Sequence, residues 1–154
     1  MRVRALTAGE EATLRSLRLR ALSDAPDQFT STYEREAARH HEDWGRWLAP
    51  GATFVAEDDG GHPVGLVAAV PDDEERAVTH LMAMWVDPAA RGTGVGDALV
   101  AAVLDWAARH ARARTRLHVM AANAPACRLY ERNGFVAVAE VERDGASQIV
   151  MERR

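Results

Sequence analysis

Lysine is absent from this chain of 154 residues, so its permanently charged basic side chains are all arginines. A P-loop needs a lysine that reaches the β- and γ-phosphates of a nucleotide, and Schiff-base catalysis needs a lysine amine. Neither kind of site can be built from this sequence. One cysteine, Cys127, is present, which excludes an intramolecular disulfide and is typical of a reducing compartment.

Long apolar segments are absent as well. No run approaches the ~20 residues that cross a bilayer, and the opening segment MRVRALTAGEE becomes charged at once, without the apolar stretch of a secretory signal. We therefore expect a cytoplasmic protein with no membrane partner. An excess of positive charge is also lacking, because the net charge is −4, which argues against extensive nucleic-acid binding but permits a local basic pocket.

The composition that remains is typical of one globular domain, which we expect to span residues 1–154. Hydrophobic residues make up 47% of the chain and charged residues 27%, as in ordinary folded proteins. No internal repeat, low-complexity stretch or linker divides the sequence.

Hydrophobic periodicity predicts an α/β fold with a mixed, mostly antiparallel central sheet flanked by helices, in the order β-α-α-β-β-β-α-β-α-β-β. The segment AVTHLMAMWV (77–86) contains no glycine or proline and is predicted to be a central strand. The predicted strands are 2–6, 52–57, 63–70, 77–86, 115–123 and a closing hairpin over 135–154 that turns at Asp144-Gly145. The predicted helices are 10–23, 34–48 (ended by Pro50-Gly51), 95–111 and 124–133, with Gly134 just past the end of the last.

The segment VDPAARGTGVGDALV (86–100) leads from the predicted central strand into a helix, with glycine at every second position from 92 to 96. Such a loop costs backbone entropy that a simple connector need not incur, so we expect a ligand to approach this backbone closely. Backbone N–H groups at a helix N-terminus suit a diphosphate, and Arg91 adds a cation for a further phosphate oxygen or for a structural carboxylate. The alternatives are a plain tight turn and a dinucleotide fingerprint, which requires a third glycine where Asp97 stands.

The stretch VDPAARGTGVG closely resembles the acyl-CoA-binding motif of the GCN5-related N-acetyltransferase (GNAT) superfamily, in which V-x-P precedes R-G-x-G-x-G. A second stretch, NAPACRLYERNGFV (123–136), resembles the family pattern N-x-x-A-x-x-L-Y-x-x-x-G-F. Both occur in the family's order and spacing, and the resemblance covers nearly the whole chain. It implies a GNAT fold and an acetyl-CoA-dependent N-acetyltransferase that moves an acetyl group to a primary amine by direct attack in a ternary complex. The alternatives are a non-catalytic acyl-CoA-binding module and transfer of a longer acyl group.

The resemblance also implies where acetyl-CoA binds. The pyrophosphate is expected on the backbone amides of residues 92–96, and strands 77–86 and 115–123 are expected to diverge around the pantetheine arm. A backbone N–H near Val86 then faces the thioester oxygen. Asn123 is expected to contact the pantetheine or a water and, compatibly, to cap the following helix. The cofactor residues expected from the resemblance are Met84, Trp85, Val86, Arg91, Gly92, Thr93, Gly94, Val95, Gly96, Asn123 and Arg128.

Tyr130 matches the family tyrosine that points at the thioester sulfur and serves as the general acid for the departing thiolate. A thiol of pKa ~8.5 is a tolerable leaving group and a phenol of pKa ~10 is a weak acid, so loss of the hydroxyl should slow turnover rather than abolish it. The alternative is a tyrosine packed in the core.

A base or a water chain should take a proton from the acceptor, because an alkylamine of pKa ~10.4 is almost fully protonated at pH 7. The family often uses a glutamate on the strand before the glycine loop, but VTHLMAMWV contains no carboxylate. His80 is the candidate there, since strand alternation predicts that it shares a face with Met82, Met84 and Val86. The alternatives are a packed or surface His80 and a base at Glu57.

On the acceptor side, the resemblance implies that Phe29, Tyr33 and Glu34 lie where the family fold walls the amine site. We expect a small-molecule or peptide amine as partner, and strand edges and apolar helices allow a homodimer. Cys127 is interpreted as a packed helix residue. His40 and His41 lack the spacing of metal ligands to a third partner, so no metal is expected.

Overall fold

The computed structural model describes residues 1–50 and 52–154, and the expectation that Pro50-Gly51 ends a helix concerns Gly51, which lies outside them. In the described residues the strands are β1 (Arg2–Ala5), β2 (Thr53–Glu57), β3 (Pro63–Pro71), β4 (Val78–Val86), β5 (Arg114–Met120), β6 (Val136–Arg143) and β7 (Ala146–Arg153). The helices are α1 (Glu11–Asp24), α2 (Tyr33–Ala37), α3 (His41–Leu48), α4 (Val95–Arg109) and α5 (Ala124–Arg132), with short 3-10 turns η1 (Pro26–Gln28) and η2 (Pro88–Ala90).

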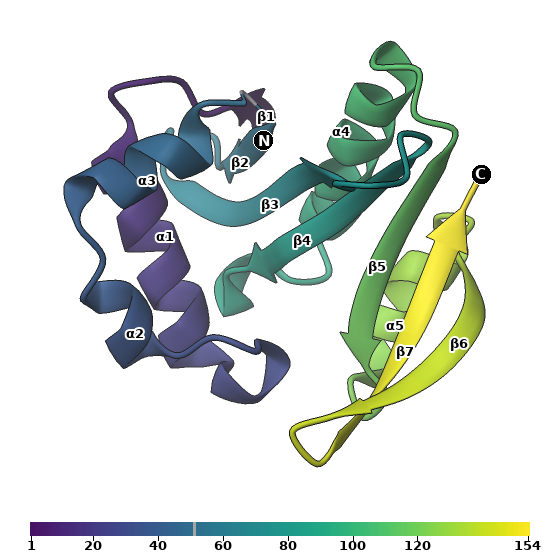
Figure 1. Cartoon of the computed structure of the whole chain (residues 1–154). Coiled ribbons are helices and arrows are strands. Elements are labelled where there is room, and N and C mark those ends of the chain that lie inside the picture. The colour runs from purple at the N-terminus through teal and green to yellow at the C-terminus, as the bar shows by residue number, and fades with distance from the viewer. Residues whose placement is uncertain (51) are drawn as a thin grey trace.

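The strands form one sheet in the order β1-β2-β3-β4-β5-β7-β6, with β4 at its centre (Figure 1). Neighbouring strands run antiparallel except β4 and β5, which are parallel. The predicted fold class and the central position of the 77–86 segment are therefore confirmed.

Helices cover both faces of this sheet, and each face has its own apolar core. The α1–α3 side, at the left of Figure 1, buries Leu6, Leu14, Leu17, Trp44 and Leu48 against Val55, Leu66 and Trp85. The opposite side buries Leu99, Val100 and Val103 of α4 and Tyr130 of α5 against Val67, Leu81, Leu117 and Met151. Because the α4 core includes residues of β3 and β4 as well as β5 and β7, it holds the two halves of the sheet together.

The single helix predicted over 34–48 is wrong: the chain forms two short helices, α2 and α3, there. Thr32 caps α2 by accepting a hydrogen bond from the backbone N–H of Arg35 at 3.2 Å. A second cap interrupts the segment, because the side chain of Asp43 accepts from the backbone N–H of His40 at 2.9 Å, and the extended backbone of His40 starts a new helix. Local side-chain capping outweighs the continuous periodicity here.

The strands β4 and β5 pair only at their beginnings. The parallel register joins Val78 with Arg114, Thr79 with Thr115 and His80 with Arg116, and goes no further among the described residues. The two strands then diverge, as expected, and Figure 1 shows them separating toward the lower end of the sheet. We call this space the β4–β5 gap.

A bulge lies in the part of β4 that borders the gap. Ala83 has a φ of +59°, and the register with β3 shifts between Leu66 and Ala68, so that β4 contains one extra residue. The expected alternation is therefore wrong beyond Met82: His80 and Met82 lie on the face of Trp85, whereas Met84 and Val86 pack with the α4 core. A β-bulge moves every later side chain to the other face of its strand.

Candidate active site

A cleft of about 840 Å³ opens at the β4–β5 gap. Its walls are the segment from Asp24 to Phe29, the end of β4, the glycine loop with the start of α4, and one face of α5. The cleft brings together most of the residues predicted at the cofactor, together with Phe29 of the acceptor wall. Those lining it are Phe29, Met84, Trp85, Val86, Arg91, Gly92, Gly94, Gly96, Asn123 and Arg128.

The glycine loop has a backbone conformation that residues with a side chain rarely adopt. Gly92 and Gly94 have φ values of +77° and +92°, and Gly94 is the N-cap of α4. A Cβ built on either would meet no atom within 4 Å, so the space in front of them is open. Gly96 serves packing instead, because a Cβ there would lie 3.2 Å from Leu129 of α5.

The backbone amides of residues 92–96 donate to no acceptor in the described parts of the chain. Several unpartnered N–H groups therefore meet at the N-terminus of α4, where the helix dipole is positive. These unpartnered N–H groups fit a diphosphate, and Gly92, Gly94 and Gly96 of the same loop line the cleft.

Arg91 is held by a carboxylate. Its Nε donates to the carbonyl of Val86 at 3.0 Å, and its NH2 group donates to Asp24 at 2.6 Å. The indole N–H of Trp85 donates to the same Asp24 oxygen at 3.0 Å, and these two donors, Trp85 first, hold the pKa of Asp24 below its ordinary value. Arg91 was expected to bind either a phosphate oxygen or a structural carboxylate. It binds the carboxylate of Asp24, and this ion pair ties the end of α1 to the glycine loop.

Asp97 stands in the first turn of α4, beside the open amides, where its charge would repel an anion. Two hydrogen bonds from Arg132 at 2.9 and 3.0 Å and one from Asn133 at 2.9 Å engage its carboxylate. Arg132 is the main reason why the pKa of Asp97 is lowered. The pair removes most of the local negative charge and fixes α5 against the start of α4.

Asn123 makes two contacts. Its side-chain oxygen accepts from the backbone N–H of Ala126 at 3.2 Å, which caps α5, and its amide nitrogen donates to Gln28 at 2.8 Å. The cap is as expected, although β5 ends at Met120, before Asn123. The contact with Gln28 joins η1 to α5 across the cleft, a link that sequence could not show because the two residues are 95 positions apart.

Tyr130 lies in the α4 core and does not line the cleft. It is 5% exposed and packs edge-on against Phe135 with ring centroids 5.9 Å apart. Burial raises the pKa of its phenol, so the hydroxyl stays protonated at neutral pH. To donate a proton to the thiolate, as expected, this hydroxyl must be accessible from the cleft.

His80 and Glu57 lie outside the cleft. The Nε2 of His80 is 2.7 Å from Asp72, whose pKa is held well below its ordinary value by the backbone N–H of Glu75, by His80 and by the backbone N–H of Glu74. Glu57 accepts a hydrogen bond from Arg4 at 3.0 Å at the far side of the sheet. The structure therefore engages both candidate bases in other contacts.

His118 of β5 is a further histidine near the gap that the sequence analysis did not single out; like His80, it does not line the cleft. Its neighbours Leu117 and Val119 face the α4 core, so its ring lies on the opposite face, the same one as His80, two residues past the last β4–β5 pair. Partial burial first, then the charges of Arg143, His80 and Arg116, lower its pKa. Alternation in RTRLHVM together with the expected divergence of the strands was the signal that could have identified it.

The remaining predicted residues lie apart from the cleft. Tyr33 is exposed and lines a neighbouring groove with Arg15 and Arg20, while Glu34 is exposed in the first turn of α2. The hydroxyl of Thr93 donates to the carbonyl of Ala90, and Val95 is buried in the α4 core. Of the three residues predicted at the acceptor site, Phe29 alone is among the described residues that line the cleft.

Phe29 is fixed by a buried ion pair that joins α1 to α2. Arg18 donates two hydrogen bonds to the fully buried Glu36, at 2.9 and 3.0 Å, and its guanidinium lies 4.8 Å from the centre of the Phe29 ring. Burial opposes the charge of Glu36, but Arg18 brings the pKa of its carboxyl below the ordinary value. The wall of the cleft is therefore preorganised by contacts behind it.

Residues 1–50 and 52–154 contain neither a candidate metal site nor a candidate membrane span. No group of three or more histidine, cysteine, aspartate or glutamate side chains is arranged there to hold a metal ion. None of the helices in the same ranges has the length and apolar character that a membrane crossing requires. Burial raises the pKa of the Cys127 thiol, which disfavours a nucleophilic thiolate.

Comparison with known proteins supports the family resemblance that the two sequence motifs indicated. The profile of the acetyltransferase (GNAT) family matches residues 18–135. A mycothiol acetyltransferase from Beutenbergia cavernae is 33% identical over 135 residues, covering 86% of this chain and 43% of its own length. One from Thermobispora bispora is 36% identical over 129 residues, covering 82% of this chain and 42% of its own length. The chain thus spans less than half the length of these relatives.

Solved structures give the same answer for the fold. An acetyltransferase of the GNAT family from Streptococcus pneumoniae has a TM-score of 0.85 and 20% identity, covering 99% of this chain and 97% of that one. A protein from Salmonella typhimurium, solved with its cofactor acetyl-CoA, has a TM-score of 0.83 and 18% identity, covering 100% of this chain and 93% of that one. The motifs, the topology and the family profile agree, and the chain belongs to the acetyltransferase (GNAT) family, whose cofactor is acetyl-CoA.

Proposed function

We propose that this protein transfers the acetyl group of acetyl-CoA to a primary amine by direct attack in a ternary complex. The observation that carries the proposal is the row of unpartnered amides at the start of α4, which open into the cleft at the β4–β5 gap. The diphosphate binds these amides, and the pantetheine arm enters the gap. There, the β5-facing backbone groups of β4 beyond His80 have no strand partner within the described chain and are available to the pantetheine amides. A backbone N–H near Val86 stabilises the oxyanion.

We place the general base at His118. Its lowered pKa keeps the imidazole neutral at pH 7, and its position past the last β4–β5 pair puts it where an amine reaching the gap from the α1 face would pass. His80 lies at the paired end of the gap and is engaged with Asp72. The proposed proton donor to the departing thiolate is the phenol of Tyr130. Burial keeps this phenol protonated but also makes it a weaker acid, so its contribution to the rate is modest.

The acceptor is proposed to be a small-molecule amine. The curated relatives are named mycothiol acetyltransferases, and a structural neighbour is a spermidine N-acetyltransferase chimera, which supports small amine substrates. A panel of polyamines, amino sugars, amino acids and short peptides, with thiol release and product mass as readouts, tests the function. We expect amine-dependent thiol release with acetyl-CoA exceeding that with longer acyl-CoAs. Coenzyme binding without release for any amine would instead indicate a non-catalytic module.

The role of the loop backbone is tested by two glycines with nearly the same φ, Gly92 at +77° and Gly145 at +78° in the β6–β7 turn. Both Gly92→Ala and Gly145→Ala should lower the free energy of unfolding by about 1–2 kcal/mol, because alanine is strained at positive φ. Only Gly92→Ala should weaken coenzyme A binding, by at least ~10-fold, because its Cβ enters the open space before the amides. Urea denaturation and calorimetry measure the two effects, and equal coenzyme affinity in both variants contradicts the role of the loop.

Replacing His118 with alanine should lower kcat/KM by roughly 10²–10³-fold at pH 7. Only the neutral imidazole accepts a proton, so wild-type activity should fall as the pH drops through a pKa below about 6.5. This acidic limb of the pH–rate profile should disappear in the variant and persist in the control His80→Ala. A limb lost with His80→Ala and retained with His118→Ala would assign the base to His80.

A further inference from the structure

The cleft contains three arginines among its described lining residues, and two of them are already neutralised. Arg91 is bound to Asp24 at 2.6 Å, and Arg132 is bound to Asp97 at 2.9 and 3.0 Å. In residues 1–50 and 52–154, no carboxylate forms an ion pair with Arg128, the third. Arg128 is therefore the lining cation whose charge is available to a ligand.

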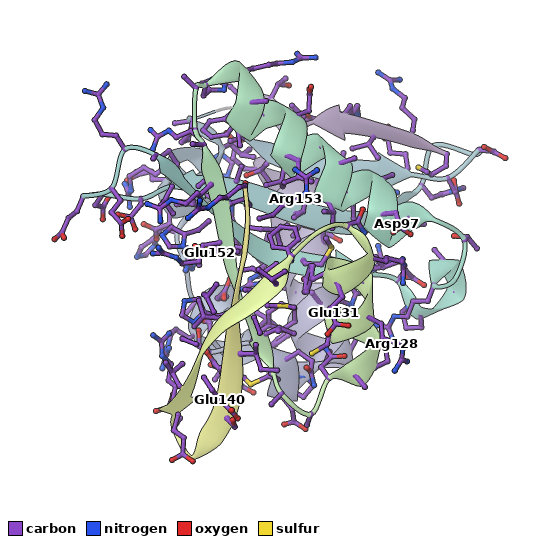
Figure 2. The ribbon with its side chains drawn as sticks, turned by 90° about the vertical axis from the view of Figure 1, so that its right-hand side faces the viewer. Asp97, Arg128, Glu131, Glu140, Glu152 and Arg153 are labelled. Carbon is purple, nitrogen blue, oxygen red and sulfur yellow. The ribbon has the colours of Figure 1, made fainter. Side chains whose placement is uncertain are left out.

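Helical geometry fixes where this cation stands. Pro125, Arg128, Leu129 and Arg132 line the cleft from α5, and their spacing of three and four residues places them on one helix face. Arg128 is thus one turn, about 5 Å, from Arg132, which is bound to the first turn of α4. Figure 2 shows Asp97 at the start of α4 and Arg128 on α5 along the same side of the molecule.

Coenzyme A carries two kinds of phosphate, a diphosphate and a phosphate monoester at the ribose 3′ position. The open amides and the dipole of α4 suit the diphosphate, as argued above. A separate cation beside that site can bind the monoester, and a guanidinium matches its oxygens with paired hydrogen bonds. We propose that Arg128 binds the 3′-phosphate and makes this protein discriminate coenzyme A from 3′-dephospho-coenzyme A. This inference rests on the proposed function.

Calorimetry with coenzyme A and with 3′-dephospho-coenzyme A tests the proposal on the wild-type protein, Arg128→Gln and Arg35→Gln. Arg35 is the matched control, since it is an exposed arginine on α2 that does not line the cleft. Wild-type protein and Arg35→Gln should bind coenzyme A about 10- to 100-fold more tightly than the dephospho form, the range expected for charge-assisted hydrogen bonds. Arg128→Gln should lose this preference by weakening coenzyme A binding alone. Arg128→Lys should retain part of it, because the charge remains without the planar fork.

Equal weakening of both ligands in Arg128→Gln would overturn the inference, because Arg128 would then contact the diphosphate. Unchanged discrimination in Arg128→Gln would overturn it as well. If the wild-type protein bound neither coenzyme, the proposed function itself would fail. The two failures are distinguishable, since the first two outcomes leave wild-type coenzyme binding intact.

Discussion

The candidate site depends on the early end of pairing between β4 and β5. After His80 and Arg116 the two strands have no common register among the described residues, and an interior strand is left with unpaired backbone groups along one edge. Unsatisfied backbone N–H and C=O groups cost free energy when buried, so such an edge persists only if solvent or a ligand satisfies it. The core on the α4 side makes the gap tolerable, because it includes residues of both halves of the sheet and holds them at a fixed separation. The fold is thus stable although the β4–β5 gap, where the pantetheine arm is proposed to lie, stays open.

Most of the acidic side chains that line the cleft at the β4–β5 gap are paired with arginines. Two of the three aspartates that line the cleft are engaged by an arginine, Asp24 by Arg91 and Asp97 by Arg132, whereas the third, Asp27 of η1, forms no ion pair within residues 1–50 and 52–154. These pairs also join elements distant in sequence, since the first ties α1 to the glycine loop and the second ties α4 to α5. Attraction for the diphosphate is then left to backbone amides and the helix dipole, which need no side chain and no lysine. The absence of lysine is therefore compatible with diphosphate binding at this site.

Several features of the fold and the site could be predicted from short stretches of sequence. The alternating glycines predicted a ligand-binding turn because positive φ at Gly92 and Gly94 is a property of the residue itself. The long strand without glycine or proline predicted the centre of the sheet, and Asn123 predicted a helix cap through its neighbours three residues on. The positive φ values, the central strand and the helix cap each depend on a few adjacent residues, so they could be predicted from the sequence, whereas ligand binding by the loop stays a prediction.

Features set by contacts across the fold were not predictable in the same way. The bulge at Ala83 depends on the register with β3, and nothing in VTHLMAMWV indicates it, so the assigned face of Met84 and Val86 was wrong. The break between α2 and α3 depends on a cap by Asp43 that competes with a continuous helical pattern. The place of His118 beyond the last β4–β5 pair depends on where the two strands part, and the contact of His80 with Asp72 depends on the folded turn before β4.

The amides at the start of α4 are proposed to bind the diphosphate of coenzyme A. Titration of ¹⁵N-labelled protein with coenzyme A, followed by backbone amide chemical shifts, tests it residue by residue. The amides of Gly92 through Gly96 should show the largest changes, together with residues of β4 along the gap. Unchanged amides in this loop, with the largest changes on another surface, would contradict it.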